Sequence, residues 1–252
     1  MQPLAASPNP FRGMVIDPAE LTSDPNLFEK QLAQALATWK EDGLLVIWLE
    51  VPIAKSALIP VAVNAGFTFH HSSEAYLMLT LRLVEDALIP NYATHYIGAG
   101  GVVLNDRREL LVVSELHRRS RDKPYYKLPG GALHPGEHLA NGVIREVLEE
   151  TGVETKFDGL VCFRHWHGYR YGKSDIYFVC RLSPLSNDIT KQDEEIEECI
   201  WMPVDDYLGS EDVGVFNKQI VSAALNNPLM VTAWVDGYNN PDTHEFFMPG
   251  LK

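Results

Sequence analysis

Apolar residues follow both helical and strand spacing in the first third of the chain. They recur at helical spacing between Leu27 and Trp39. The apolar run Leu44–Glu50 then predicts a buried strand, Pro52–Ala65 a helix and Ala75–Val84 a further strand. This β-α-β order favours a small α/β layer.

The rest of the chain is richer in strand patterns. Tyr96–Asn105 and Leu110–Glu115 predict strands on either side of a polar turn. Further strands are expected near Lys156–Arg164 and Ser174–Leu182, and apolar positions in Gly214–Leu225 predict a helix. Because 252 residues suit two compact units, we expect three segments: a domain over 11–90, a second over 94–212, and a C-terminal helix and tail over 213–252 that pack on the second domain.

One predicted helix, Ala140–Thr151, has an apolar face beside an acidic face. At about 100° per residue, Val143 and Val147 fall on the face that would pack on a sheet. Gly152 is placed as the left-handed residue that ends the helix. The adjoining face carries three carboxylates: Glu146, Glu149 and Glu150.

An acidic helix face is usually only solvated surface, but two penalties argue for a functional site here. Glu146 and Glu150 form a like-charge i,i+4 pair, which costs about 0.2–0.5 kcal/mol. All three glutamates also lie in the last two turns, where the helix dipole already disfavours negative charge. A hard divalent cation would turn both penalties into attraction. The glycines Gly130 and Gly131, just before this region, would permit close approach to a ligand.

Adjacent histidines in the first block, His70 and His71, could be interpreted as a metal pair. Neighbouring residues on a strand point to opposite faces, which is poor geometry for two ligands of one ion. We therefore favour a structural role for both imidazoles.

A motif that begins at Gly131 includes the acidic helix. Residues 131–153 follow G-x5-E-x7-R-E-U-x-E-E-x-G-U, where U is aliphatic, with every defining position filled. This sequence is identified as the Nudix box, the signature of hydrolases that act on a nucleoside diphosphate linked to another moiety. The resemblance covers about residues 11–210 and extends to a branch with an additional N-terminal domain. That branch includes plant ADP-ribose and NADH pyrophosphatases and the animal protein encoded antisense to basic fibroblast growth factor. The flanking segments that carry it include Phe163–His167, Gly172–Cys180, Glu194–Glu198 and Trp201–Val204.

The resemblance implies an α+β fold. The second domain is expected to be an α-β-α sandwich with a mixed sheet and the box helix. The smaller N-terminal α/β domain is expected to resemble half of an acetyltransferase-like fold.

The implied reaction is attack of water on phosphorus in a diphosphate bridge, assisted by Mg²⁺ or Mn²⁺. By the family pattern, Glu146, Glu149 and Glu150 would bind the metal, and the carbonyl of Gly131 would complete the set. Arg145 would orient these groups by pairing with Glu149 or with Glu137, and Glu137 would act as a support.

The general base and the substrate contacts stay open at this stage. Either a box glutamate or an acid from a later loop could be the base, which makes Glu149 and Glu195 the candidates. Lys127 and Arg164 could bind phosphate, although ordinary surface bases explain them equally well. By resemblance we favour ADP-ribose or NADH as substrate. A dinucleoside polyphosphate or RNA-cap hydrolase and a non-catalytic nucleotide-binding regulator are the alternatives.

Composition narrows the setting in which these residues would act. A net charge of −13 argues against binding of a long nucleic acid, because a polyanion would be repelled. It leaves a small nucleotide-derived substrate as the expected partner. The three cysteines, Cys162, Cys180 and Cys199, share no close spacing and predict reduced thiols. The apolar runs are far shorter than a membrane span, and residues 1–10 do not resemble a secretory signal. We therefore expect a cytoplasmic protein without a membrane partner, and a homodimer.

Overall fold

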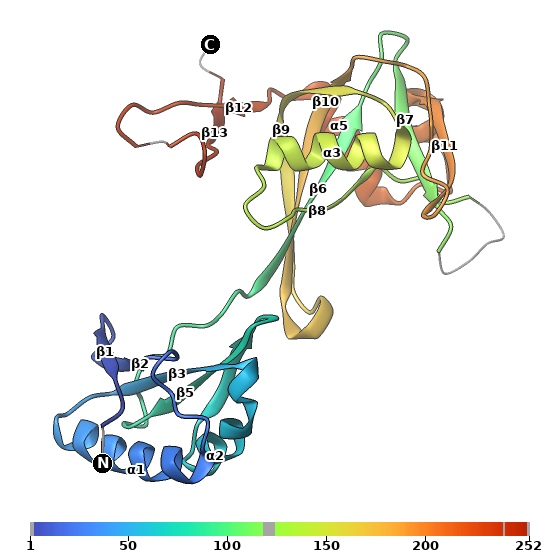
Figure 1. Cartoon of the computed structure of the whole chain (residues 1–252). Coiled ribbons are helices and arrows are strands. Elements are labelled where there is room, and N and C mark those ends of the chain that lie inside the picture. Colours follow the sequence, from blue (N-terminus) through green and yellow to red (C-terminus); the bar gives the residue numbers. More distant parts are fainter. Residues whose placement is uncertain (1–2, 118–123, 239, 251–252) are drawn as a thin grey trace. The chain divides into compact units, whose positions relative to one another are not determined.

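The computed structural model of the chain describes residues 3–117, 124–238 and 240–250. It divides into two compact units, Met1–Thr94 and His95–Lys252 (Figure 1). Within the described residues, no helix combines the length and apolar character needed to cross a membrane.

The first unit is an α/β layer, as the sequence predicts. Asp24 is the N-cap residue of helix α1, and its carboxylate accepts a hydrogen bond from the Asn26 N–H at 2.9 Å. Phe28 and Leu32 of α1 are buried in one core with Ile47 of the sheet. The strands lie in the order β1-β2-β3-β5-β4, with β2 and β3 parallel. The elements are β1 (Ala6–Asn9), β2 (Gly13–Ile16), α1 (Pro25–Glu41), β3 (Val46–Pro52), the 3₁₀ helix η1 (Ile53–Leu58), α2 (Ile59–Asn64), β4 (Thr68–Ser72) and β5 (Tyr76–Arg82).

The single helix predicted over Pro52–Ala65 is wrong, because the segment is divided into η1 and α2. Pro60 lies in the first turn of α2, where a residue without an N–H is tolerated. The same proline cannot donate the hydrogen bond that would continue a helix from the residues before it.

The two histidines of β4 also differ from expectation. A bulge between Phe69 and His71 shifts the register of β4 against β5, so the two imidazoles do not point apart. Their Nδ1 atoms lie 2.7 Å apart. His70 also contacts the Pro90 carbonyl at 2.7 Å, and the His71 ring stacks on Tyr92. The contacts of both rings with neighbouring residues agree with a structural role.

The second unit is built on a mixed sheet, in the order β13-β12-β9-β10-β6-β8, with β7 and β11 forming a separate pair. Strands β6 and β10 are parallel, whereas β9 runs antiparallel to β10. The elements are β6 (His95–Val103), β7 (Glu109–Glu115), β8 (Gly130–Ala132), α3 (Leu139–Thr151), β9 (Thr155–Trp166), the 3₁₀ turn η2 (Arg170–Gly172), β10 (Ser174–Pro184), β11 (Ile196–Pro203), α4 (Val204–Gly209), α5 (Val215–Asn226), β12 (Met230–Thr232) and β13 (Phe247–Pro249).

Helices cover both faces of this sheet. Successive strand residues point to opposite faces, and on β10 Val179 joins the core with α5 whereas Cys180 joins the core with α3. Helix α3 contributes Val143 and Val147 to its core, and α5 contributes Ile220 to the other. The predicted α-β-α arrangement with a mixed sheet is therefore confirmed, and it presents the acidic face of α3 beside β8.

Candidate functional site

The acidic helix is α3, which ends where the sequence predicts and begins one residue before the predicted Ala140. It runs from Leu139 to Thr151, and Gly152 ends it with φ at 72° in the left-handed region. The apolar residues Val143 and Val147 are fully buried. Burial of this face leaves the glutamate-bearing face against the loop that enters β8.

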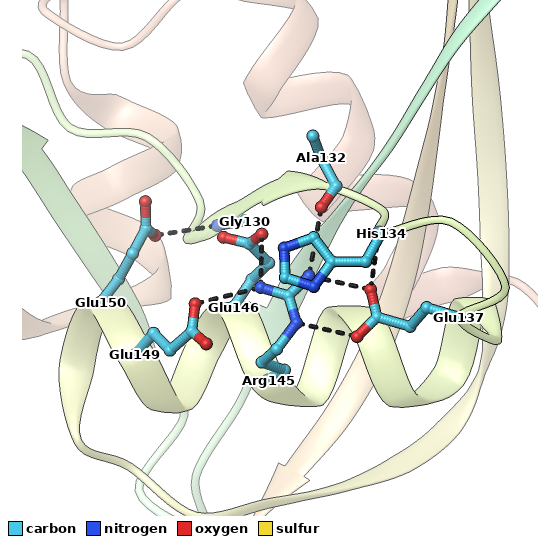
Figure 2. Close-up of polar contacts among 8 residues, drawn as sticks. All are labelled: Gly130, Ala132, His134, Glu137, Arg145, Glu146, Glu149 and Glu150. Carbon is cyan, nitrogen blue, oxygen red and sulfur yellow. Dashed lines mark hydrogen bonds and ion pairs between the residues drawn. The ribbon is translucent and has the colours of Figure 1, made fainter. Parts of the chain in front are cut away.

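Arg145 holds three of the four carboxylates of the motif together (Figure 2). Its Nε and Nη2 atoms donate to the two oxygens of Glu137, at 2.8 and 2.9 Å. Its Nη1 atom donates to Glu146 at 2.8 Å and to Glu149 at 3.0 Å, and Nη2 also donates to the Ala132 carbonyl at 3.1 Å. Hydrogen bonding to Arg145 lowers the pKa of Glu137 to about 2. Both pairings considered for Arg145, with Glu137 and with Glu149, are thus present at once.

Glu150 has a different environment from its neighbours. Glu150 is only 6% exposed, and one of its carboxylate oxygens accepts a hydrogen bond from the Gly130 N–H at 2.9 Å (Figure 2). Burial raises the pKa of Glu150 to about 7, although the nearby Lys127 and the Gly130 N–H both act to lower it. The result is a desolvated carboxylate without a cationic side chain hydrogen-bonded to it in the described part of the chain.

Gly130 and Gly131, before the helix, provide space for these carboxylates. A Cβ atom on Gly131 would lie 2.4 Å from an oxygen of Glu146, so any side chain there would displace that carboxylate. Gly130 adopts φ at 147°, which side chains disfavour, and a Cβ there would lie 2.3 Å from the Ala99 carbonyl oxygen. The Gly131 carbonyl oxygen faces β6, and its role as a metal ligand stays a prediction.

A cavity of about 780 Å³ opens over the carboxylates. It brings together Glu146, Glu149 and Glu150 of α3 with Glu195, which lies far along the chain. Several lining residues had no place in the sequence-based site: Tyr96, Glu115, His134, Arg170, Tyr171, Asp175, Tyr177 and Gln192. They come from strands β6, β7 and β10, from η2 and from loops, and share no local pattern.

The two predicted phosphate-binding bases are placed differently. Lys127 lines the cavity and forms an ion pair with Glu115. Arg164 is not among the lining residues; its guanidinium donates to Asp175 at 2.5 Å and lies over the ring of Trp166. The Arg164 guanidinium is thus paired with Asp175, which does line the cavity, and its role as a phosphate contact stays a prediction.

The donor set fits a hard divalent cation in its chemistry. Carboxylate oxygens are the ligands that Mg²⁺ and Mn²⁺ prefer. A cation would also stabilise the charged form of the buried Glu150 carboxylate. Within the described residues, no three His, Cys, Asp or Glu side chains are already arranged as a metal site. In Figure 2 the Arg145 guanidinium lies between the Glu137 carboxylate and those of Glu146 and Glu149 and is hydrogen-bonded to all three.

The C-terminal segment supplies a contact that the sequence did not reveal. His138, the N-cap residue of α3, makes no side-chain capping bond. Instead, the Glu245 carboxylate accepts the N–H groups of Leu139 at 2.6 Å and of Ala140 at 3.1 Å. His138 Nε2 also contacts the Pro241 carbonyl at 2.8 Å. A residue more than one hundred positions away therefore acts as the cap and places a negative charge at the positive end of the helix dipole.

Replacing Glu245 with alanine should lower the free energy of unfolding by about 1–2 kcal/mol, because two N–H groups of α3 lose their acceptor. Thermal unfolding followed by circular dichroism measures this, and Glu245→Gln should fall between alanine and wild type since it keeps an acceptor without the charge. The exposed Glu211 provides a matched control through Glu211→Ala. A Glu245→Ala protein as stable as wild type would show that the cap contributes nothing.

Two family models match the chain, one on each compact unit. The model of the Nudix hydrolase domain matches residues 4–83, and the model of the NUDIX domain matches residues 94–223.

Curated relatives align with both units. The chain is 42% identical over 186 residues to Nudix hydrolase 2 of Arabidopsis thaliana, covering 73% of this chain and 67% of that protein. It is 37% identical over 207 residues to Nudix hydrolase 8 of the same plant, covering 81% of this chain and 56% of that protein. With human nucleoside diphosphate-linked moiety X motif 6 it shares 35% identity over 206 residues, covering 80% and 64% of the two chains. The chain thus spans between about half and two thirds of the length of these relatives.

Proposed function

This chain belongs to the Nudix hydrolase family, and from that premise we propose that it hydrolyses a diphosphate bond in a small nucleoside-diphosphate-linked substrate. The observation that supports this best is the buried Glu150 carboxylate, which lies on the cavity beside Glu146 and Glu149. Such a cluster of anions is poorly stable alone and would be neutralised by a divalent cation.

Glu146, Glu149 and Glu150 are the residues proposed to bind Mg²⁺, with Mn²⁺ as the alternative. A bound cation would neutralise phosphate oxygens and lower the pKa of a bound water. Arg145 keeps Glu146 and Glu149 on the cavity side of α3, and Glu137 in turn fixes the Arg145 fork. Lys127 is the proposed phosphate contact, because it lines the cavity together with Glu115, the residue that its ammonium pairs with.

The proton of the attacking water would pass to Glu149 or Glu195. Both carboxylates line the cavity. One oxygen of Glu149 accepts a hydrogen bond from Arg145 at 3.0 Å, whereas the Glu195 side chain makes no hydrogen bond with other described residues. Because Arg145 already occupies one oxygen of Glu149, we favour Glu195 as the general base.

ADP-ribose and NADH are the favoured substrates because the chain resembles the plant pyrophosphatase branch. The cavity has tyrosines as well as carboxylates, which suits a ligand with both an aromatic base and phosphates. The homodimer, the cytoplasmic location and the three-segment domain division stay predictions.

The test is turnover of a substrate panel with and without metal. Purified protein with Mg²⁺ should release AMP from ADP-ribose or NADH in preference to diadenosine polyphosphates and capped RNA. Dialysis against EDTA should reduce the rate to background, and Mg²⁺ or Mn²⁺ should restore it. A folded, metal-supplemented protein that binds ADP-ribose without cleaving it would favour the regulatory alternative, and cleavage unaffected by EDTA would remove the metal from the proposal.

A further inference from the structure

Tyr177, on β10, has a hydroxyl group at the cavity that forms no hydrogen bond within the described part of the chain. It stands opposite Gly98 in the parallel pair β6–β10 and lines the cavity over the carboxylates. The hydroxyl of Tyr207 also lacks a partner but is fully buried, whereas the hydroxyl of Tyr177 is not fully buried. A polar group that reaches a cavity without a protein partner is available to a ligand.

Three glycines keep the space that this side chain occupies. A Cβ atom on Gly100 would lie 2.3 Å from the Tyr177 hydroxyl oxygen, and one on Gly98 would lie 3.0 Å from its ring. A Cβ on Gly130 would lie 2.8 Å from the same hydroxyl oxygen. Any larger residue at Gly100 or Gly130 would force the hydroxyl away, so its position depends on glycine in two different strands.

Gly130 also relates the hydroxyl to the acidic cluster, because its N–H donates to Glu150. The Tyr177 hydroxyl therefore lies by the carboxylates proposed to hold the cation, where the diphosphate of a substrate would be. Burial, and then the charges of Glu150 and Glu146, raise the pKa of Tyr177. The group is therefore a hydrogen-bond donor at neutral pH.

We propose that the Tyr177 hydroxyl donates a hydrogen bond to a non-bridging phosphate oxygen of the bound diphosphate. The inference rests on the proposed function, since it assumes a diphosphate in the cavity. Hydrogen bonds to charged oxygens are stronger than those between neutral groups, and this one would stabilise the charge on the phosphate during attack by water.

The test replaces Tyr177 with phenylalanine, which keeps the ring in its glycine-lined space. We expect kcat/KM for ADP-ribose with Mg²⁺ to fall about 10-fold to 100-fold. The Kd for α,β-methylene ADP-ribose, measured by calorimetry, should rise while the unfolding temperature is unchanged. Tyr207→Phe is the matched control, because its buried hydroxyl has no partner in the described structure and should leave both values at wild type.

The outcomes separate this inference from the proposed function. Hydrolysis and analogue binding at wild-type levels in Tyr177→Phe would overturn the role of Tyr177 and leave the function intact. A wild-type protein that neither cleaves ADP-ribose nor binds the analogue would overturn both. As a second variant, Gly100→Ala should weaken analogue binding by displacing the hydroxyl; unchanged binding in a folded Gly100→Ala protein would also contradict the proposal.

Discussion

Replacing Glu150 with glutamine is expected to lower kcat on the order of a thousandfold. The substitution removes one anionic oxygen donor from the proposed cation site and preserves the shape of the side chain. Losing several kcal/mol of charge stabilisation corresponds to about three powers of ten in rate. Steady-state kinetics with ADP-ribose and Mg²⁺ measures the effect. Glu154→Gln is the matched control, since Glu154 is exposed and does not line the cavity.

The same substitution should stabilise the metal-free protein at alkaline pH. The pKa of Glu150 in the folded protein is about 7, above its ordinary value near 4.5, so the folded state holds this proton more tightly than the unfolded chain does. Stability from Glu150 is therefore present below about pH 4.5 and is lost as pH rises towards 7. At pH 8 in EDTA, Glu150→Gln should gain up to about 3 kcal/mol over wild type.

Near pH 5 the metal-free variant and wild type should unfold at similar temperatures, and Mg²⁺ should raise the unfolding temperature of wild type much more than that of the variant. An inactive variant that is less stable than wild type at pH 8 would indicate a structural role for Glu150. Wild-type kcat in the variant would remove Glu150 from the site.

The local sequence pattern was enough to predict helix α3 and the motif of residues 131–153, because both depend on residues that are close together along the chain. Helical spacing placed Val143 and Val147 in the core, and Gly152 as the cap has the expected left-handed φ. The burial of Glu150 follows from the same geometry: it lies beside the apolar arc of the helix, whereas Glu149 lies on the other side of Glu146.

What the sequence did not predict depends on contacts between distant segments. Glu245 reaches the start of α3 from the C-terminal segment, and Gln192 reaches the cavity from the loop before β11. Tyr177 shares its space with glycines from β6 and β8, which become neighbours only when the sheet forms. Arg164 is a candidate phosphate contact because of its charge, but local pattern does not reveal that its guanidinium donates to Asp175, a diagonal neighbour on the adjacent strand β10. Periodicity within one segment carries no information on such pairs.

Arg145→Lys is expected to reduce activity by about a hundredfold although the positive charge is kept. Arginine here makes five hydrogen bonds in a planar fork, and a lysine ammonium cannot reach both oxygens of Glu137 and the two glutamates of α3 together. Misplacement of the carboxylates by about 1 Å is sufficient for a loss of this size. The measurement is kcat and KM with ADP-ribose over a range of Mg²⁺ concentrations, in which the variant should need more metal.

Arg145→Ala should lose still more, because it leaves Glu137, Glu146 and Glu149 close together without their shared cation. We expect a drop of about 2–4 kcal/mol in the free energy of unfolding without metal, part of which saturating Mg²⁺ should restore. Arg107→Lys is the control, since Arg107 pairs with Glu109 on the exposed surface. Arg145→Lys turnover equal to wild type would mean that charge alone, and not the fork, positions the glutamates. If instead neither Arg145 variant changes the metal requirement, Arg145 does not set the positions of the proposed ligands, and the orientation of the carboxylates must come from the packing of α3 alone.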